Sequence, residues 1–251
     1  MEKYENKNMI LAEKSTGETM GQLRQRVFSE LSLDPNTKLT FAGRLDPLAS
    51  GVVVFLLNER RFQKDEFLSL NKSYSFQIIL GLKTDTGDPL GLIECVDFSR
   101  KIEEAEVINT LKKFESKYRQ KYPKFSSRKV DGRALFEHTR NQNEVKIPDH
   151  EIEIFALSLQ KTREIKKEDL LDNIFTLIRK VEGDFRQEKI IKRWQEIEDD
   201  IPNKVQVLDC NVECSSGTYV RVLTEDIAKE LNTVATTQNI HRSKIGHLQT
   251  K

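Results

Sequence analysis

The spacing of apolar residues predicts helices in five parts of the chain. In each part, apolar side chains recur every three or four positions, so that they share one face of a helix. The first of these helices begins with Thr19 and Gln22, whose spacing matches a capping box, a motif that pairs each side chain with the other residue's backbone. The predicted helices cover residues 19–31, 107–114, 170–181, 190–197 and 219–231.

Four other segments have the apolar pattern of strands. Residues 52–57 (VVVFLL) are apolar without a break, which is typical of a strand buried on both faces. In 72–80 and 205–214, apolar and polar residues alternate, as expected for strands with two different faces. A further strand is predicted at 151–159.

Two of the predicted helices fall between the last two predicted strands. Gly183 separates them, so 166–199 is predicted to be a helical hairpin and 161–204 an insertion in the fold. The chain has no internal repeat and no long linker rich in Gly, Ser or Pro. These patterns predict one α+β domain over residues 1–251 that carries a helical insertion.

Composition excludes several classes of protein. Of the 251 residues, 37% are hydrophobic and 32% are charged, which is too hydrophobic for a disordered chain. The longest apolar run, at 52–57, is far shorter than the roughly 20 residues that a membrane-spanning helix needs. The first ten residues lack a signal-peptide pattern, and three cysteines without a CxxC pair fit a reducing compartment. We therefore expect a cytoplasmic protein with no membrane partner.

The 41 basic and 40 acidic residues nearly cancel, but they are unevenly distributed. From Lys112 to Arg140 there are ten basic and three acidic residues, with five aromatic side chains among them. Such a segment suits RNA, because phosphates attract cations and unpaired bases stack on rings. The commoner explanation of a charge cluster is a solvated helix face with a flexible loop. Residues 161–204, in contrast, contain eleven charges of each sign and are predicted to form a solvated surface.

The sequence lacks the common motifs for metals, nucleotides and hydrolases. The histidines and cysteines do not have zinc-site spacing, and there is no GxGxxG, P-loop or GxSxG motif. Two polar turn segments remain, one around Asp46 and one ending at Arg221. Asp46 is either a turn former or a carboxylate held at the end of a sheet, where active sites are common. Arg221, at the start of a predicted helix, is either exposed or paired with a carboxylate.

Segments spread over residues 10–248 resemble, in order, the motifs of the TruB family of tRNA pseudouridine synthases. GRLDPLASG at 43–51 resembles the nucleophile loop of the family, and SSGTYVR at 215–221 resembles its Ser-x-Gly-Thr-Tyr-Ile-Arg motif. The remaining matches are KSY at 72–74, LGLKTDTGDPLG at 80–91, FSSRKVDGRALFE at 125–137 and IHRSKIG at 240–246.

The resemblance implies a pseudouridine synthase fold, in which a mixed, mostly antiparallel central sheet is flanked by helices. It also implies that uridine-55 in the T loop of tRNA becomes pseudouridine: the base leaves the ribose, turns, and is reattached through carbon. No cofactor or metal is expected. Leu48 and Ala49 replace the Lys-Val of guide-RNA-dependent relatives, so we expect a monomer that binds the tRNA T arm without guide RNA. We also expect the C-terminal PUA-type domain of many members to be absent.

The matched motifs imply three catalytic residues. Asp46 is the catalytic carboxylate, acting as a nucleophile or stabilising the departing glycosidic bond. Arg221 is its partner, and Asp88 is a second carboxylate in the same network. A partly buried Asp tends toward protonation, so the neighbouring cation keeps it ionised. Seven residues are implied to bind the substrate. Tyr74 stacks on the flipped base, Tyr219 and Ile240 line its pocket, and Lys72 touches phosphate or supports its strand. The others are Phe41, Arg44 and Arg242.

The sequence departs from the family pattern at two places. Phe41 stands where bacterial members usually have a His, and Lys14-Ser15 stands where Lys-Pro is expected. In addition, the triplet Arg44-Leu45-Asp46 also occurs in the RsuA and RluA families of ribosomal RNA pseudouridine synthases. Two alternatives therefore remain: a ribosomal RNA pseudouridine synthase, and a catalytically weak tRNA-binding and folding protein.

Overall fold

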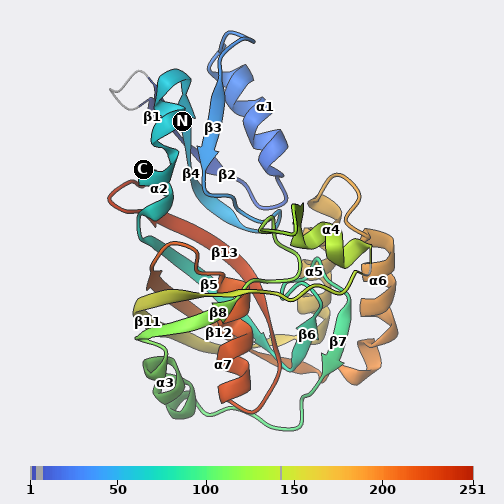
Figure 1. The fold of residues 1–251 in the computed structure, drawn as a ribbon. Helices are drawn as coiled ribbons and strands as arrows, with labels where there is room; N and C mark the ends of the chain where they lie inside the picture. Colours follow the sequence, from blue (N-terminus) through green and yellow to red (C-terminus); the bar gives the residue numbers. More distant parts are fainter. Residues whose placement is uncertain (1, 4–7, 142, 251) are drawn as a thin grey trace.

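A computed structural model describes residues 2–3, 8–141 and 143–250. Its centre is a nine-stranded sheet with the order β1-β2-β4-β13-β5-β12-β11-β8, in which β3 also pairs with β4 (Figure 1). The β4–β13 pairing is parallel and the others are antiparallel, so the expected mixed, mostly antiparallel sheet is confirmed. The strands are β1 (Glu2–Lys3), β2 (Met9–Lys14), β3 (Leu39–Ala42), β4 (Ser50–Leu57), β5 (Lys72–Leu80), β8 (Lys117–Lys121), β11 (Asp149–Lys166), β12 (Lys204–Cys214) and β13 (Ala235–Ile245).

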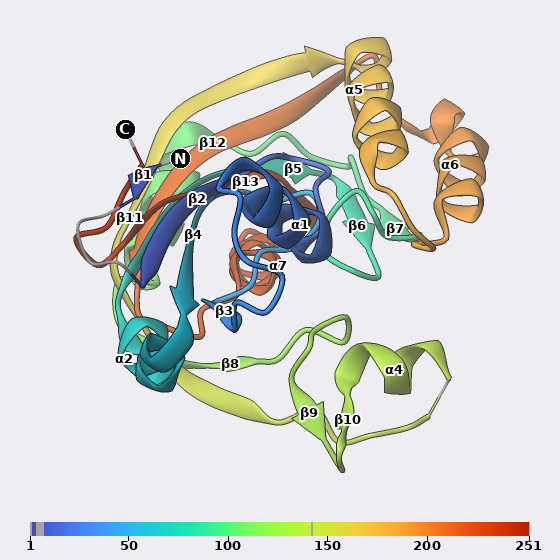
Figure 2. The same cartoon turned by 90° about the horizontal axis from the view of Figure 1, so that it is seen from above.

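Strand β4 is buried on both faces, as its continuous apolar sequence predicts. Val53 and Phe55 belong to the main core cluster, whereas Val52 and Val54 belong to a smaller cluster on the opposite face. Three helices pack on the main cluster and a short helix packs on the smaller one, and Figure 2 shows β11 and β12 curving around α7. These helices are α1 (Met20–Glu30), α3 (Glu104–Lys113) and α7 (Val220–Glu230) on the main cluster and α2 (Lys64–Ser69) on the other.

The predicted capping box at the start of α1 is confirmed. The Thr19 side chain accepts a hydrogen bond from the Gln22 backbone at 3.2 Å, and the Gln22 side chain accepts one from the Thr19 backbone at 2.7 Å. Two backbone N–H groups of the first turn are thereby satisfied. The cap fixes where the helix begins, and Leu23 and Val27 then fall on its buried face.

A helix pair lies between β11 and β12, as predicted. It consists of α5 (Lys167–Lys180) and α6 (Gln187–Glu196), whose apolar faces share a core cluster with β6 (Leu82–Thr84) and β7 (Ile93–Val96). The boundary predicted at residue 161 was wrong, because β11 stays paired with β12 up to Lys166 opposite Lys204. Residues 161–166 are mostly polar, so the apolar pattern gave no signal for this part of the strand.

Among the helices of the described ranges, none combines the length and the apolar character that crossing a membrane requires.

Short elements complete the described part of the chain. The remaining elements are η1 (Asn58–Gln63), β9 (Lys129–Val130), β10 (Arg133–Ala134), α4 (Leu135–Arg140) and η2 (Glu198–Asp200).

Candidate active site

The two polar turn segments from the sequence meet in space. Asp46 lies in the loop between β3 and β4, and Arg221 lies in the first turn of α7. Arg221 Nε donates a hydrogen bond to Asp46 Oδ2 at 2.8 Å. The Arg221 side chain is 3% exposed and that of Asp46 is 40% exposed, so a buried arginine holds a carboxylate that faces solvent. A carboxylate in this position is fixed by a charge-assisted hydrogen bond and is accessible to a substrate.

Asp88 is the second carboxylate at Arg221. Its Oδ2 atom lies 3.8 Å from Arg221 Nε, and its Oδ1 atom accepts hydrogen bonds from Leu90 N at 3.0 Å and Thr86 Oγ1 at 2.8 Å. Burial raises the pKa of Asp88, the Arg221 charge opposes this rise, and the Asp46 charge adds to it. The structure thus brings together all three residues that the resemblance implied as catalytic.

The Arg221 guanidinium is held on every side. Besides Asp46, it donates to the backbone carbonyl of Thr86 and, at 3.3 Å, to that of Phe125. Burial acts to lower the pKa of Arg221, but the charges of Asp46 and Asp88 outweigh it and raise the pKa. The arginine therefore remains protonated, with a fixed orientation relative to Asp46.

Two further buried cations hold the backbone of the loop that carries Asp46. Arg242 is 2% exposed and donates to the carbonyls of Val52 at 2.8 Å and of Arg44 and Gly43 at 3.3 Å. Lys14 is fully buried, and its Nζ atom donates to Pro47 O at 3.0 Å and Ala49 O at 2.5 Å. Burial lowers the pKa of Lys14 to about 8.

The positions of these cations change the interpretation of three residues. Arg242 was expected to bind substrate, but its guanidinium is turned inward onto the loop carbonyls, away from solvent. Lys72 is also buried and donates to Leu68 O at 2.5 Å, so it supports its strand and is not placed to touch a phosphate. The role of Lys14 was missed, although its place at the expected Lys-Pro motif was a usable signal.

Aromatic side chains lie on two sides of the Asp46–Arg221 pair. Tyr219 is the residue before α7, and its ring packs edge-on against those of Tyr122 and His150, which stack at 4.1 Å. Tyr74 lies on β5 opposite Arg242. Burial raises the pKa of both tyrosines, and the charge of Asp46 adds to the rise in each. Both hydroxyls are therefore close enough to Asp46 to interact with its charge.

A buried glutamine, which the sequence did not single out, fixes Tyr219. Gln120 is 1% exposed, and its side chain accepts a hydrogen bond from Tyr219 N at 2.8 Å and donates one to Tyr219 O at 3.3 Å.

Phe41 and Arg44 are at the start of the loop that carries Asp46. The Phe41 ring packs edge-on against the Phe55 ring, with centroids 6.1 Å apart. The guanidinium carbon of the exposed Arg44 side chain lies over the Phe41 ring, 5.3 Å from its centroid.

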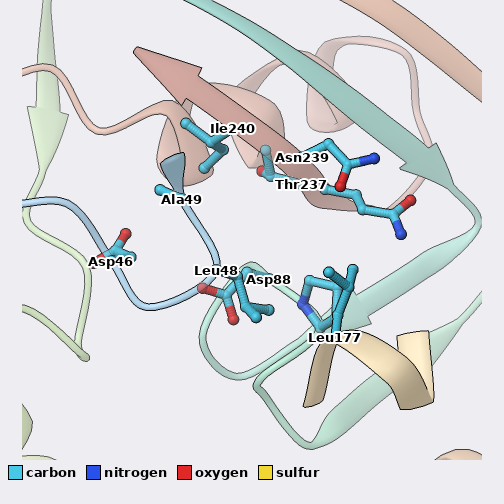
Figure 3. A pocket seen from close by; sticks show the side chains of 10 residues that line it. Asp46, Leu48, Ala49, Asp88, Leu177, Thr237, Asn239 and Ile240 are labelled. Atoms are coloured by element: carbon cyan, nitrogen blue, oxygen red, sulfur yellow. The ribbon is translucent and has the colours of Figure 1, made fainter. Parts of the chain in front are cut away.

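A hollow that is partly open to solvent lies beside the carboxylates, and its enclosed part has room for about one water molecule. Asp46, Asp88 and the expected Ile240 line it, and so does Leu177 from α5 (Figure 3). Tyr74 and Tyr219 are not among the lining residues, so a direct contact of either ring with a base in this hollow stays a prediction. The lining residues are Asp46, Leu48, Ala49, Asp88, Pro89, Leu177, Thr237, Gln238, Asn239 and Ile240.

Two polar groups in the hollow's wall are unsatisfied. Thr237 and Gln238 are 0% and 3% exposed, and the Thr237 Oγ1 and Gln238 Nε2 atoms have no hydrogen-bond partner among the described residues. Buried polar atoms are rarely left in this state, because each unmade bond costs about 1–3 kcal/mol. In the ranges the structure covers, no group of three or more His, Cys, Asp or Glu side chains is placed to hold a metal ion.

The basic segment from Lys112 to Arg140 forms the end of α3, strands β8, β9 and β10, and helix α4. Part of its charge is compensated: Arg119 pairs with Asp149, and Lys117 lies 3.9 Å from Glu153. Arg128 lies 4.9 Å from the centroid of the Tyr122 ring, next to the aromatic cluster at Tyr219. The remaining exposed basic residues of the segment include Lys121, Lys124, Arg128, Lys129 and Arg133.

Comparison with known proteins gives consistent matches. Residues 32–172 match the family model described as TruB family pseudouridylate synthase (N terminal domain). The chain is 32% identical over 240 residues to tRNA pseudouridine synthase B of Mesoplasma florum, which covers 95% of this chain and 68% of that protein. It is 29% identical over 210 residues to tRNA pseudouridine synthase B of Caldicellulosiruptor saccharolyticus, covering 84% of this chain and 58% of that protein.

Among solved structures, the chain is similar to a crystal structure of a Cbf5-Nop10-Gar1 complex. The TM-score is 0.59 at 18% sequence identity, and the match covers 97% of this chain and 50% of the other. At this identity the likeness shows a shared fold. The chain spans less than two thirds of the length of several other curated relatives, for example 58% and 55%.

Proposed function

Since the chain belongs to the TruB family of pseudouridylate synthases, we propose that it isomerises uridine-55 in the T loop of tRNA to pseudouridine. The observation that carries this proposal is the contact at 2.8 Å between buried Arg221 and half-exposed Asp46 at the edge of a hollow. We further propose that the protein acts as a monomer, without guide RNA, metal or cofactor.

The reaction requires no group that the chain itself does not provide. The N1–C1′ bond breaks and a C5–C1′ bond forms, while C5 loses a proton and N1 gains one, so atoms and electrons balance within the nucleotide. Asp46 acts in one of two ways. Its carboxylate forms a transient bond to a substrate carbon, or its charge stabilises the electron-poor ribose while the base is detached. Both routes use the carboxylate form of Asp46, which Arg221 holds in place through its hydrogen bond at 2.8 Å.

The uridine must leave its stack to reach Asp46. Flipping a base out costs about a few kcal/mol, which contacts in the enzyme's pocket offset. Ile240 and Leu48 offer an apolar surface in the hollow, and Tyr74 remains the proposed stacking residue. The exposed Arg44 at the loop entrance is proposed to contact the RNA backbone.

The unsatisfied atoms of Thr237 and Gln238 support recognition of the base in this hollow. Uracil carries two carbonyl acceptors and one N–H donor, so it offers partners to the Gln238 amide and the Thr237 hydroxyl. Thr237→Val is expected to slow the reaction without lowering stability, because the hydroxyl has no partner among the residues that the structure describes.

Thr224→Val is the matched control for this variant. The Thr224 hydroxyl is also buried and has no hydrogen-bond partner in the described part of the chain, but it does not line the hollow. Loss of the Thr224 hydroxyl is expected to leave the reaction rate unchanged. The rate of pseudouridine formation and the thermal unfolding midpoint are measured for both variants, so that a slower reaction can be told apart from a less stable protein. Equal rates for the two valine variants would contradict a role of Thr237 in base recognition.

The exposed basic residues between β8 and α4 are proposed to bind the phosphates of the T arm. Arg128 beside Tyr122 adds a cation and a ring near Tyr219, an arrangement suited to an unstacked nucleotide. Because three basic residues of this segment are paired with carboxylates, the attraction is weaker than the sequence count implies.

The substrate is tested with unmodified transcripts. The purified protein is incubated with a tRNA carrying uridine-55, with the same tRNA carrying cytidine-55, and with a ribosomal RNA fragment, and pseudouridine is mapped at single-nucleotide resolution. The proposal predicts product at position 55 of the first transcript alone. Product in the ribosomal RNA alone would favour the ribosomal alternative, and tight tRNA binding without product would favour the tRNA-folding alternative.

A further inference from the structure

The connection between α5 and α6, residues 181–186, reaches the catalytic centre. Its last residue, Arg186, has a left-handed backbone with φ of 65°. Its guanidinium forms a two-pronged contact with Asp85, with Nη1 at 2.8 Å from Oδ2 and Nη2 at 3.1 Å from Oδ1. The side chains of Arg186 and Asp85 are only 27% and 18% exposed, so solvent screens this pair less than an ordinary surface ion pair.

The same guanidinium also lies on an aromatic ring. Its central carbon is 4.7 Å from the centroid of the Phe125 ring. Phe125 belongs to the segment between β8 and β9, whereas Asp85 belongs to the turn after β6. Arg186 therefore joins two segments that are distant in the sequence, and a lysine could not do both because it lacks the planar fork.

These two segments are the ones that hold the catalytic arginine. Arg221 donates to the carbonyl of Thr86, the residue after Asp85, and to the carbonyl of Phe125 itself. We infer that Arg186 is a positioning residue: by tying Asp85 to Phe125, it fixes the two carbonyls that orient Arg221 toward Asp46. This inference rests on the proposed function for its effect on the reaction.

Other contacts anchor the connection in place. Asp184 O accepts a hydrogen bond from Arg140 of α4 at 2.9 Å, and Glu182 accepts one from Gln22 of α1 at 2.7 Å. Leu177, in the last turns of α5, lines the hollow. The helix pair thus contacts α1 and α4 and lines the hollow, which gives this segment a role other than holding phosphates and agrees with its balanced charge.

Three variants test the inference. Arg186→Gln removes the fork and the charge, and Arg186→Lys keeps the charge without the fork. Arg179→Gln is the matched control, because Arg179 is exposed on α5 and its guanidinium likewise lies over a ring, that of Phe175, at 5.7 Å. Each protein is compared with wild type for the single-turnover rate of pseudouridine formation at saturating enzyme, for tRNA affinity, and for amide hydrogen exchange.

We expect Arg186→Gln to lower the single-turnover rate about tenfold or more, because small displacements of catalytic groups have effects of this size. Its tRNA affinity should stay within about twofold of wild type, since its guanidinium is already engaged by Asp85 and by the Phe125 ring. Arg186→Lys should give an intermediate rate, and Arg179→Gln should match wild type. In Arg186→Gln, amides of residues 84–88 and 123–128 should exchange faster, while those of β4 should not.

Two results would overturn the inference. One is a rate and an exchange pattern in Arg186→Gln that match those of Arg179→Gln; the other is a loss of tRNA affinity as large as the loss of rate, which would make Arg186 an RNA contact. If Arg186→Gln does not fold, the comparison of Arg186→Lys with wild type decides. Hydrogen exchange needs no substrate, so it tests the tie even if the wild-type protein makes no pseudouridine and the proposed function fails.

Discussion

Two sets of buried cations hold the loop that carries Asp46, and they act on different parts of it. Arg221 binds the Asp46 side chain and lies beside Asp88, so its charge is compensated by carboxylates. Lys14 and Arg242 bind main-chain carbonyls of the loop, and neither forms an ion pair within the described part of the chain.

The pKa shifts follow this difference. The charges of Asp46 and Asp88 raise the pKa of Arg221 against the effect of burial, whereas burial lowers the pKa of Lys14 to about 8. For Lys14 the charges of Glu18 and Asp46 oppose this lowering of the pKa without cancelling it. A buried cation without a paired carboxylate is costly, and its benefit here is the set of hydrogen bonds that it donates. The comparison indicates that charge matters on the side of the loop where the proposed catalytic carboxylate lies, and that donor geometry matters on the side that supports the loop backbone.

The largest effect is expected for Arg221→Lys. Lysine keeps the charge but cannot contact Asp46 and the carbonyls of Thr86 and Phe125 together. The single-turnover rate should fall by about 10²–10³, the range observed when one preorganised electrostatic contact of an active site is removed. Affinity for tRNA, measured by filter binding, should change little. A rate close to wild type would show that charge alone is sufficient at this position.

A smaller effect, on stability, is expected for Lys14→Met. Methionine removes the Lys14 donor from Ala49 O, whereas Pro47 O keeps its hydrogen bond from Gly17 N at 2.9 Å, so the free energy of unfolding at pH 7 should fall by about 1–3 kcal/mol. Urea unfolding measures this change. Lys38→Met, at an exposed position, is the control and should leave the unfolding free energy nearly unchanged.

The same variant has a pH dependence with a defined sign. The pKa of Lys14 is about 8 in the folded protein, whereas its ordinary value, expected in the unfolded chain, is 10.5. Between these two pH values, Lys14 binds a proton in the unfolded chain but not in the folded protein. Stability therefore rises with pH across this window through Lys14, and the advantage of wild type over Lys14→Met should grow from pH 8 to pH 10. An advantage that stays flat or shrinks would contradict the buried, uncompensated ammonium.

The smallest effect is expected for Asp88→Asn, again as a pH dependence. Burial raises the pKa of Asp88 above its ordinary value of 3.8, so at mildly acidic pH the folded protein binds a proton that the unfolded chain does not. As pH falls through this window, wild type should gain stability relative to Asp88→Asn. Thermal unfolding of both proteins between pH 4 and pH 7 measures the difference, and a relative loss by wild type would contradict the shift.

Helices and several strands could be predicted because their apolar spacing matches their burial. The stripe of α5 is an example, since Leu170, Ile174 and Ile178 are all buried. In contrast, β13 gave no strand signal, because its buried positions include Thr236, Thr237 and Gln238. Only tertiary contacts make polar residues part of an interior, and local patterns do not reveal them.

The site shows the same division. Asp46, Asp88 and Arg221 were identified by motif resemblance, and the structure places them within one network. The inward direction of Arg242 and the contribution of Leu177 depend on how distant segments pack. Sequence reasoning expects a cation at the surface, because arginine and lysine are rarely buried without a partner.

The central claim is that the Asp46 carboxylate, held by Arg221, carries out the isomerisation of tRNA uridine. The most direct measurement is the single-turnover formation of pseudouridine in a uridine-55 transcript by wild type and by Asp46→Asn, with tRNA affinity measured for both. Asparagine is nearly isosteric but cannot be ionised, so product should be abolished while affinity stays largely intact. Appreciable pseudouridine formation by Asp46→Asn would contradict the account.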